Sequence, residues 1–138
     1  MTTGSRKFFN VFLFSSLALL LISFAPPTQC LAFETIIDVA PNTLNLQSNG
    51  NVVTVHTGID FGDVDVSTVY LNGIAINSWK ADNRGYFVAK FLIDDVKGLP
   101  LAINDLNTLK IVGLTMSDLS FWGEQDIMVV DNVPAGRK

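Results

Sequence analysis

Three aspartates stand close together in the glycine-rich segment Asp60-Phe61-Gly62-Asp63-Val64-Asp65. Ca²⁺ takes about six to eight oxygen ligands, which carboxylates on a flexible loop supply. Asp60, Asp63 and Asp65 therefore form a candidate calcium site. Since no bidentate partner stands at a fixed spacing from them, a solvated acidic loop between two strands is the simpler interpretation. One histidine and one cysteine are too few for a zinc site. We expect no cofactor, with calcium as the one alternative.

Hydrolytic chemistry has little support in the sequence. His56 is the only histidine, and a hydrolytic triad would need it beside a nucleophilic serine, yet the chain has no G-x-S-x-G elbow. Glycoside hydrolysis needs two carboxylates across a cleft. Five further acids are available for this role, but no recognisable framework holds them: Asp94, Asp95, Asp118, Glu124 and Asp126. We therefore expect a non-enzymatic protein, with a small hydrolase as the least favoured hypothesis.

Aromatic residues offer a different chemistry, because exposed rings stack on sugars and anchor protein interfaces. The set comprises Tyr70, Trp79, Tyr86, Phe121 and Trp122. The candidate binding residues among them are Trp122, Phe121, Tyr86 and Trp79. Trp122 is the favoured candidate for an exposed contact, because it follows Phe121 in a loop-like stretch, Ser120 to Gly123. The alternative is that the tryptophans cap the open core of a β-sandwich.

The elements that would position these side chains are strands. Short runs of β-branched and aromatic residues recur between Gly, Asn, Asp and Pro clusters, and no run has the apolar spacing of an amphipathic helix. Two runs alternate strictly: Asn51 to Ile59 places Val53, Val55, Thr57 and Ile59 on the core face, and Tyr86 to Ile93 places Phe87, Ala89, Phe91 and Ile93 there. The other expected strands are Glu34–Val39, Val66–Leu71, Ile74–Trp79, Leu109–Thr115 and Asp126–Val130. About seven strands in roughly 100 residues predict an all-β fold, an immunoglobulin-like antiparallel β-sandwich.

The connections between these strands also carry signals. Asn72-Gly73 predicts a tight hairpin turn, since both residues tolerate positive φ. The residues from Asp82 to Gly85 predict another turn, and the stretch from Asp94 to Leu101 allows a single helical turn at the end of the sandwich. The residues from Met116 to Glu124 are expected to bridge the last two strands.

The start of the chain has the pattern of a secretory signal. Arg6 and Lys7 precede an uncharged apolar run from Val11 to Ala25, which two prolines end before it reaches the length of a membrane span. Small residues at 30 and 32 favour cleavage before Phe33. We therefore expect a signal-peptide helix and cleavable signal at 1–32, and one mature domain at 33–138 without cysteine. The mature domain keeps seven basic and 13 acidic residues, a net charge of −6, which disfavours nucleic-acid binding.

Two sequence blocks resemble a known kind of module. The blocks are Asp38-Val39-Ala40-Pro41-Asn42-Thr43-Leu44-Asn45-Leu46-Gln47-Ser48-Asn49-Gly50 and Val64-Asp65-Val66-Ser67-Thr68-Val69-Tyr70-Leu71-Asn72-Gly73. They are similar to a short immunoglobulin-like β-sandwich module of exported bacterial and archaeal proteins, and the likeness spans nearly all of Phe33 to Val130. It implies a fold and a place outside the cytoplasm but no activity. Related modules carry an acidic loop before the phenylalanine-rich strand, where this chain has Arg84, which argues against calcium at that loop.

Together these observations predict an exported, non-catalytic module. Its expected location is extracellular, periplasmic or in the cell envelope, with no permanent membrane span. The expected partner is an extracellular or cell-surface protein or polysaccharide, bound through one sheet face or the aromatic loop. The alternative is a structural or self-assembling envelope component that pairs through its strand edges.

Overall fold

The computed structural model describes Ala25 and residues 31–133 of the chain. Nearly all of the predicted signal peptide, 1–32, lies outside the described residues, so its helix and its cleavage stay predictions. Within the described part, no helix combines the length and hydrophobicity that a membrane crossing requires.

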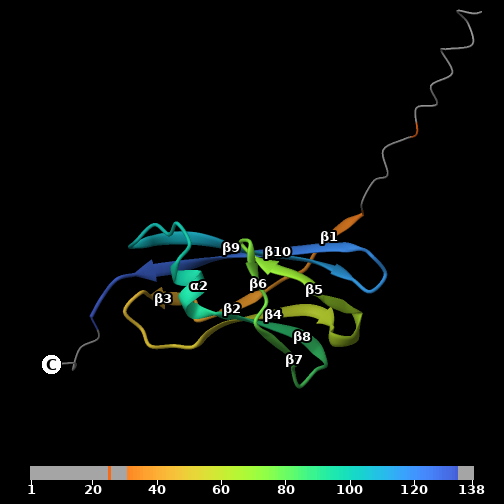
Figure 1. Ribbon diagram of the computed structural model, residues 1–138, viewed down its shortest axis with the longest axis horizontal. Coiled ribbons are helices and arrows are strands. Elements are labelled where there is room, and N and C mark those ends of the chain that lie inside the picture. Colours follow the sequence, from red (N-terminus) through yellow and green to blue (C-terminus); the bar gives the residue numbers. More distant parts are fainter. Residues whose placement is uncertain (1–24, 26–30, 134–138) are drawn as a thin grey trace, which may run out of the picture.

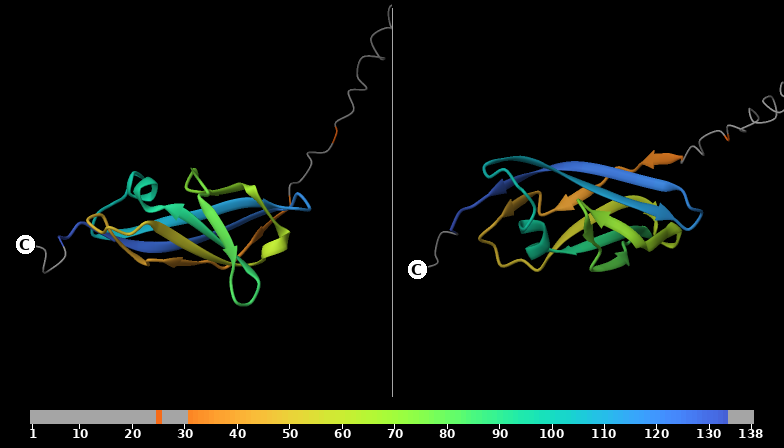
Figure 2. Two further views of the ribbon diagram at one scale, coloured as in Figure 1. Left: turned by 60° about the horizontal axis from the view of Figure 1, so that its bottom comes forward. Right: turned by 45° about the horizontal axis from the view of Figure 1, so that its top comes forward.

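Two sheets face each other in the described residues (Figures 1 and 2). Sheet A has the order β1-β10-β9-β5-β6, with β3 also paired to β10. Its strands are β1 (Ala32–Glu34), β3 (Thr43–Asn45), β5 (Val64–Leu71), β6 (Ile74–Ala75), β9 (Asp105–Thr115) and β10 (Ser120–Val130). Sheet B has the order β2-β4-β8-β7, with β2 (Asp38–Ala40), β4 (Val52–Asp60), β7 (Ser78–Ala81) and β8 (Tyr86–Leu92). The prediction of an all-β sandwich is confirmed, with ten strands in this part of the chain where about seven were expected.

Most strand pairs are antiparallel, as predicted. The exceptions are β1 and β3, which both pair with β10 in parallel. A short 3-10 helix, η1 (Phe61–Asp63), joins β4 to β5, and the short helix α2 (Ile93–Lys97) follows β8. The helix α2 lies within one residue of the stretch where a single helical turn was expected, and its Ile93 and Val96 side chains are buried.

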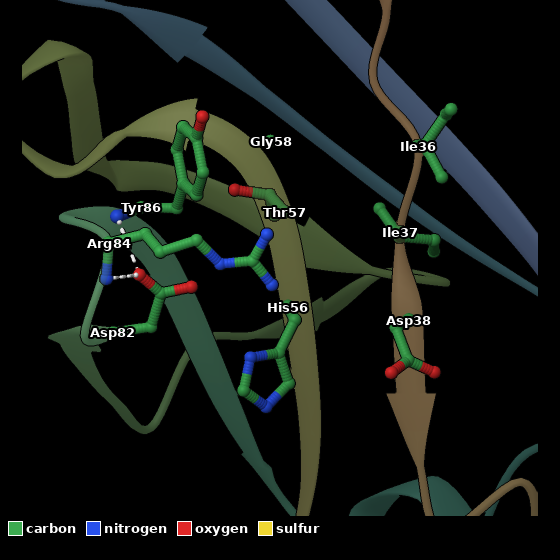
Figure 3. A pocket seen from close by; sticks show the side chains of 9 residues that line it. All are labelled: Ile36, Ile37, Asp38, His56, Thr57, Gly58, Asp82, Arg84 and Tyr86. Carbon is green, nitrogen blue, oxygen red and sulfur yellow. Dashed lines mark hydrogen bonds between the residues drawn. The ribbon is translucent and has the colours of Figure 1, made fainter.

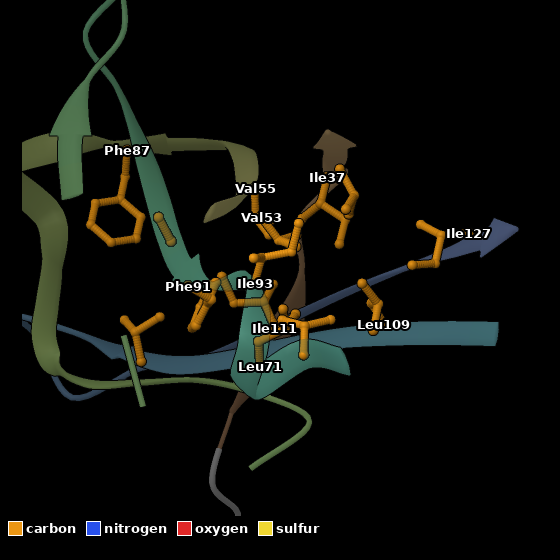
Figure 4. Packing of buried hydrophobic residues seen from close by; sticks show 14 of the residues in the cluster. Ile37, Val53, Val55, Leu71, Phe87, Phe91, Ile93, Leu109, Ile111 and Ile127 are labelled. Carbon is orange, nitrogen blue, oxygen red and sulfur yellow. The ribbon is translucent and has the colours of Figure 1, made fainter. Parts of the chain in front are cut away.

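The two alternating runs supply the centre of the core (Figure 4). On β4 the side chains of Val53, Val55, Thr57 and Ile59 are buried, and on β8 those of Phe87, Ala89 and Phe91 have no exposed surface. Both predicted core faces are therefore confirmed. The opposite layer of the core comes from sheet A, where Leu71, Leu109, Ile111, Phe121, Ile127 and Val129 are buried.

The first predicted strand, Glu34–Val39, is in fact two strands in different sheets. The strand β1 ends at Glu34 in sheet A, β2 begins at Asp38 in sheet B, and the residues between them cross the sandwich. The crossing is fixed to β10 by a hydrogen bond from the Thr35 N–H to the Trp122 carbonyl, at 2.8 Å. Gly123 makes room for it, because a Cβ there would lie 2.5 Å from the Thr35 carbonyl oxygen.

The hairpin at Asn72-Gly73 forms as predicted, with positive φ at both residues (46° and 83°). Its return arm is shorter than expected, since only Ile74 and Ala75 pair in sheet A as β6. The chain then changes sheets, and the residues from Ser78 onward pair with β8 in sheet B. The predicted strand Ile74–Trp79 is thus divided in the same way as the first one.

The expectation of a loop from Met116 to Glu124 is wrong. A tight turn reverses the chain, with the Thr115 N–H donating to the Leu119 carbonyl at 2.8 Å and Asp118 at φ 60°. The strand β10 then begins at Ser120 and pairs with β9 as far as Val129. Phe121 and Trp122 therefore lie in a strand, where they point to opposite faces of sheet A.

Candidate functional site

The three aspartates of the candidate calcium site lie on three successive elements. Asp60 ends β4, Asp63 ends η1 and Asp65 lies on β5. The Asp65 carboxylate accepts hydrogen bonds from the N–H and hydroxyl of Ser67, at 3.2 and 2.7 Å. Across residues 31–133, no three acidic, histidine or cysteine side chains are arranged to hold a metal ion, so these carboxylates do not converge on one point.

The four predicted binding aromatics are placed in four different environments. Phe121 has no exposed surface and packs beside Phe33, with ring centroids 6.2 Å apart, so it is a core residue and not the exposed contact that was expected. Trp79 is 46% exposed on the edge strand β7, on the same face as the buried Ala89. Tyr86 lies beside a hollow on the outer face of sheet B. Trp122 is half-buried on the outer face of sheet A.

Trp122 belongs to a row of outward-facing apolar side chains that crosses three strands. Val112 on β9 stands directly opposite Trp122 on β10 and also opposite Tyr70 on β5. Directly opposed residues of antiparallel strands point to the same face of a sheet. That face is the outer one, because the sequence neighbours Leu71, Ile111 and Phe121 have no exposed surface. We call Tyr70, Val112 and Trp122 the aromatic row.

The aromatic row is accessible to a partner. Tyr70 is 42% exposed and Val112 is 37% exposed. The surface is hollowed on both sides of Val112: one depression of about 420 Å³ is bordered by Tyr70, Thr68 and Ser120. The other, of about 360 Å³, is bordered by Asn72, Thr108, Lys110 and Glu124. Hydroxyl, amide and charged groups therefore surround an apolar centre.

Lys110 adds a cation to this surface. Its Nζ atom lies 5.1 Å from the centroid of the Trp122 ring, within the range of a cation–π contact. Glu124 stands directly opposite Lys110 in the β9–β10 register. The Trp122 ring is therefore held beside a hydrogen-bond donor and an acceptor.

Side-chain hydrogen bonds fix β5 against β9 on both sides of the row. The Thr68 hydroxyl donates to the Asp65 carbonyl at 2.7 Å and accepts from the Leu114 N–H at 2.8 Å, which bridges the irregularity in the β5–β9 register. At the other end the Asn72 amide donates to the Thr108 carbonyl at 3.1 Å and accepts from the Lys110 N–H at 2.7 Å. The rings thus project from a preorganised sheet, which lowers the entropy cost of binding.

Sequence reasoning identified Trp122 and named Tyr70 among the aromatics, but it missed that they form one row. Val112 and Lys110 were not among the candidates, although alternation along the strand Leu109–Thr115 places both on the face opposite to that of Leu109 and Ile111. The row depends on the register between strands that are far apart in the chain, since Tyr70 and Val112 are 42 positions apart. Local spacing does not report that register.

Comparison with protein-family models, curated proteins and solved structures finds no match for this chain. Its function is therefore inferred from the geometry of the aromatic row.

Proposed function

We propose that this chain is an exported, non-catalytic, immunoglobulin-like module that binds an extracellular or cell-surface polysaccharide through the aromatic row. The observation that carries the proposal is the strand register that brings Tyr70, Val112 and Trp122 together on the outer face of sheet A. The secretory pattern of residues 1–32 supports a location outside the cytoplasm. The two-sheet sandwich and the two sequence blocks quoted above support the immunoglobulin-like type.

The spacing of the rings favours an extended glycan over a small ligand. Tyr70 and Trp122 are separated by two strand spacings, about 9.6 Å, and lie on the same face of sheet A. Each ring can stack on the apolar face of one sugar unit. The hydroxyls of Thr68 and Ser120, the amide of Asn72 and the charges of Lys110 and Glu124 can pair with sugar hydroxyls. The net charge of the mature domain favours neutral over polyanionic glycans.

The experiment is retention of the purified protein on insoluble polysaccharides and on cell-envelope material, with the bound fraction read on gels. Tyr70→Ala and Trp122→Ala should each weaken retention about tenfold or more, since central aromatic side chains dominate such interfaces. Trp79→Ala is the matched control, because it removes an exposed ring on the other sheet. Retention on no polysaccharide, or retention that survives both row substitutions, would contradict the proposal. A protein partner would be indicated if the protein were retained only on envelope material and protease treatment of that material abolished the retention.

Self-assembly is a second candidate, favoured by the edge strand β7 in sheet B. One side of β7 is unpaired within the described residues, and Trp79 is 46% exposed on it. Unpaired strand edges accept partner strands. Light scattering separates the two functions: a mass that rises with concentration supports assembly, whereas a monomer at every concentration supports the binding module alone.

A further inference from the structure

A hollow of about 330 Å³ lies on the outer face of sheet B, away from the aromatic row. Three segments line it: Ile36 to Asp38 at the start of β2, His56 to Gly58 on β4, and Asp82, Arg84 and Tyr86 at the β7–β8 turn. Figure 3 shows these side chains around the opening. We call this depression the sheet-B hollow.

An irregularity in β4 opens the hollow. The β4–β8 register shifts between His56 and Asp60, as in a β-bulge. The Thr57 side chain turns inward and its hydroxyl donates to the Phe87 carbonyl at 2.8 Å, while the Gly58 N–H donates to the Thr35 hydroxyl at 3.2 Å. Gly58 leaves the wall of the hollow without a side chain at this point.

The turn beside the hollow is fixed by Asp82. One oxygen of its carboxylate accepts the backbone N–H groups of Arg84 and Tyr86, at 2.8 and 3.0 Å (Figure 3). The Tyr86 N–H is the main cause of a lowered pKa for the Asp82 carboxyl, with smaller contributions from the Arg84 N–H and from the charges of Arg84 and His56. Asp82 therefore remains ionised and holds the turn that presents Arg84.

Arg84, His56 and Asp38 line the hollow with polar groups. Within residues 31–133, no side-chain hydrogen bond or salt bridge ties Arg84, His56 or Asp38 to another residue, although the charges of Arg84 and His56 act on the Asp82 carboxylate. In Figure 3 the Arg84 guanidinium reaches from the turn toward β4, near Thr57 and His56. Asp38 stands directly opposite His56 in the β2–β4 register. The hollow thus holds a guanidinium that forms no salt bridge, in the field of the Asp82 carboxylate, and on its far wall the Asp38 carboxylate.

This combination selects a particular ligand chemistry. A guanidinium pairs with a carboxylate through two parallel hydrogen bonds. The Asp38 carboxylate accepts a hydroxyl or ammonium proton. Apolar contact is also available, because Ile36 is 91% exposed at the rim and Tyr86 contributes a ring. The volume of the hollow lies at the lower end of the range for small-molecule sites.

We propose that the sheet-B hollow binds a small carboxylate that also carries a hydrogen-bond donor, with its carboxylate on Arg84 and its donor on Asp38. Two sources share this chemistry, a uronic acid and a free amino acid. The site lies on the opposite sheet from the aromatic row and does not depend on it.

The test is an NMR titration of the ¹⁵N-labelled protein with glucuronate, with leucine and with glucose. Glucuronate or leucine should give saturable shifts at the amides of Gly58, Arg84 and Gly85, with Kd on the order of 1 mM for an exposed site of this kind. Arg84→Gln should raise that Kd about tenfold or more. Lys80→Gln is the matched control, because it removes the same charge from β7 outside the lining of the hollow and should leave Kd unchanged.

Each result has one meaning. Saturation by glucuronate alone supports the proposal with a sugar acid as the source, and saturation by leucine supports it with an amino acid. The proposal would be overturned if neither glucuronate nor leucine gave saturable shifts. It would also be overturned if Arg84→Gln and Lys80→Gln weakened ligand binding equally, or if glucose bound as tightly as the carboxylates. Arg84 is exposed, so an unchanged melting temperature in Arg84→Gln excludes misfolding. Repeating the titration with Tyr70→Ala separates this site from the aromatic row, because that variant should bind as the native protein does.

Discussion

Phe121 and Trp122 are neighbours in the sequence with opposite places in the fold, and their substitutions should have opposite effects. Phe121 has no exposed surface. Truncating a fully buried phenylalanine costs about 3–5 kcal/mol, because it removes burial and leaves a cavity. A domain of this size is stable by roughly 5–10 kcal/mol in total. Phe121→Ala should therefore remove around half of the free energy of unfolding, which lowers Tm by more than about 12 °C.

Trp122→Ala should be much milder. The ring is half-buried on the outer face, and its specific contact is with Lys110. A cation–π contact at an exposed site contributes about 0.5–1 kcal/mol. The substitution should cost on the order of 1 kcal/mol in stability while it weakens retention on polysaccharide.

Urea unfolding followed by circular dichroism measures both variants without relying on tryptophan emission. The two free energies of unfolding should differ by at least about 2 kcal/mol, with Phe121→Ala the less stable. Equal destabilisation by the two substitutions, or a loss below about 1 kcal/mol in Phe121→Ala, would refute the placement of these residues on opposite faces of β10.

Three further predictions concern the frame that holds both sites. Gly123→Ala should destabilise the protein by roughly 1–3 kcal/mol in urea unfolding, because the new Cβ would lie 2.5 Å from the Thr35 carbonyl oxygen. An unchanged urea midpoint would contradict the close approach of the chain at Thr35 to Gly123. Gly73→Ala should lower the free energy of unfolding by about 1 kcal/mol in the same assay, since Gly73 has φ 83° in the hairpin. Gly62→Ala is its control, because the added Cβ would have open space around it. The lowered pKa of Asp82 stabilises the fold at pH values above the unfolded-state pKa, and this contribution is lost as the pH falls through the folded-state pKa. The stability gap between native protein and Asp82→Asn should therefore be widest near neutral pH and narrow in acid; a gap independent of pH would contradict that role.

The parts of the fold that could be predicted are those in which neighbouring residues alone decide the structure. Alternation along β4 and β8 reports which face is buried, since successive side chains of a strand point to opposite faces. The Asn72-Gly73 turn is equally local, because positive φ at two adjacent residues is needed. The predicted core residues of these strands are buried, but Val88, on the other face of β8 and expected nearer to water, is also fully buried.

The errors arose where a distant segment decides the structure. Gly123 was placed in a loop-like stretch, but it is a strand residue whose missing side chain leaves room for the crossing chain at Thr35. That contact joins residues 88 positions apart in numbering, so the loop assignment for Ser120 to Gly123 failed together with the expected exposure of Phe121. The two sheet changes, after Glu34 and after Ala75, likewise depend on pairing with distant strands.

Fluorescence of Trp122 gives the most direct measurement on the aromatic row. The chain has two tryptophans, so Trp79→Phe leaves Trp122 as the only one. Titration of this variant with soluble oligosaccharides from a retained polysaccharide should shift the Trp122 emission saturably, and adding Tyr70→Ala should abolish the shift. Emission that stays constant while the polysaccharide still retains the protein would contradict the account, because binding would then occur away from the aromatic row.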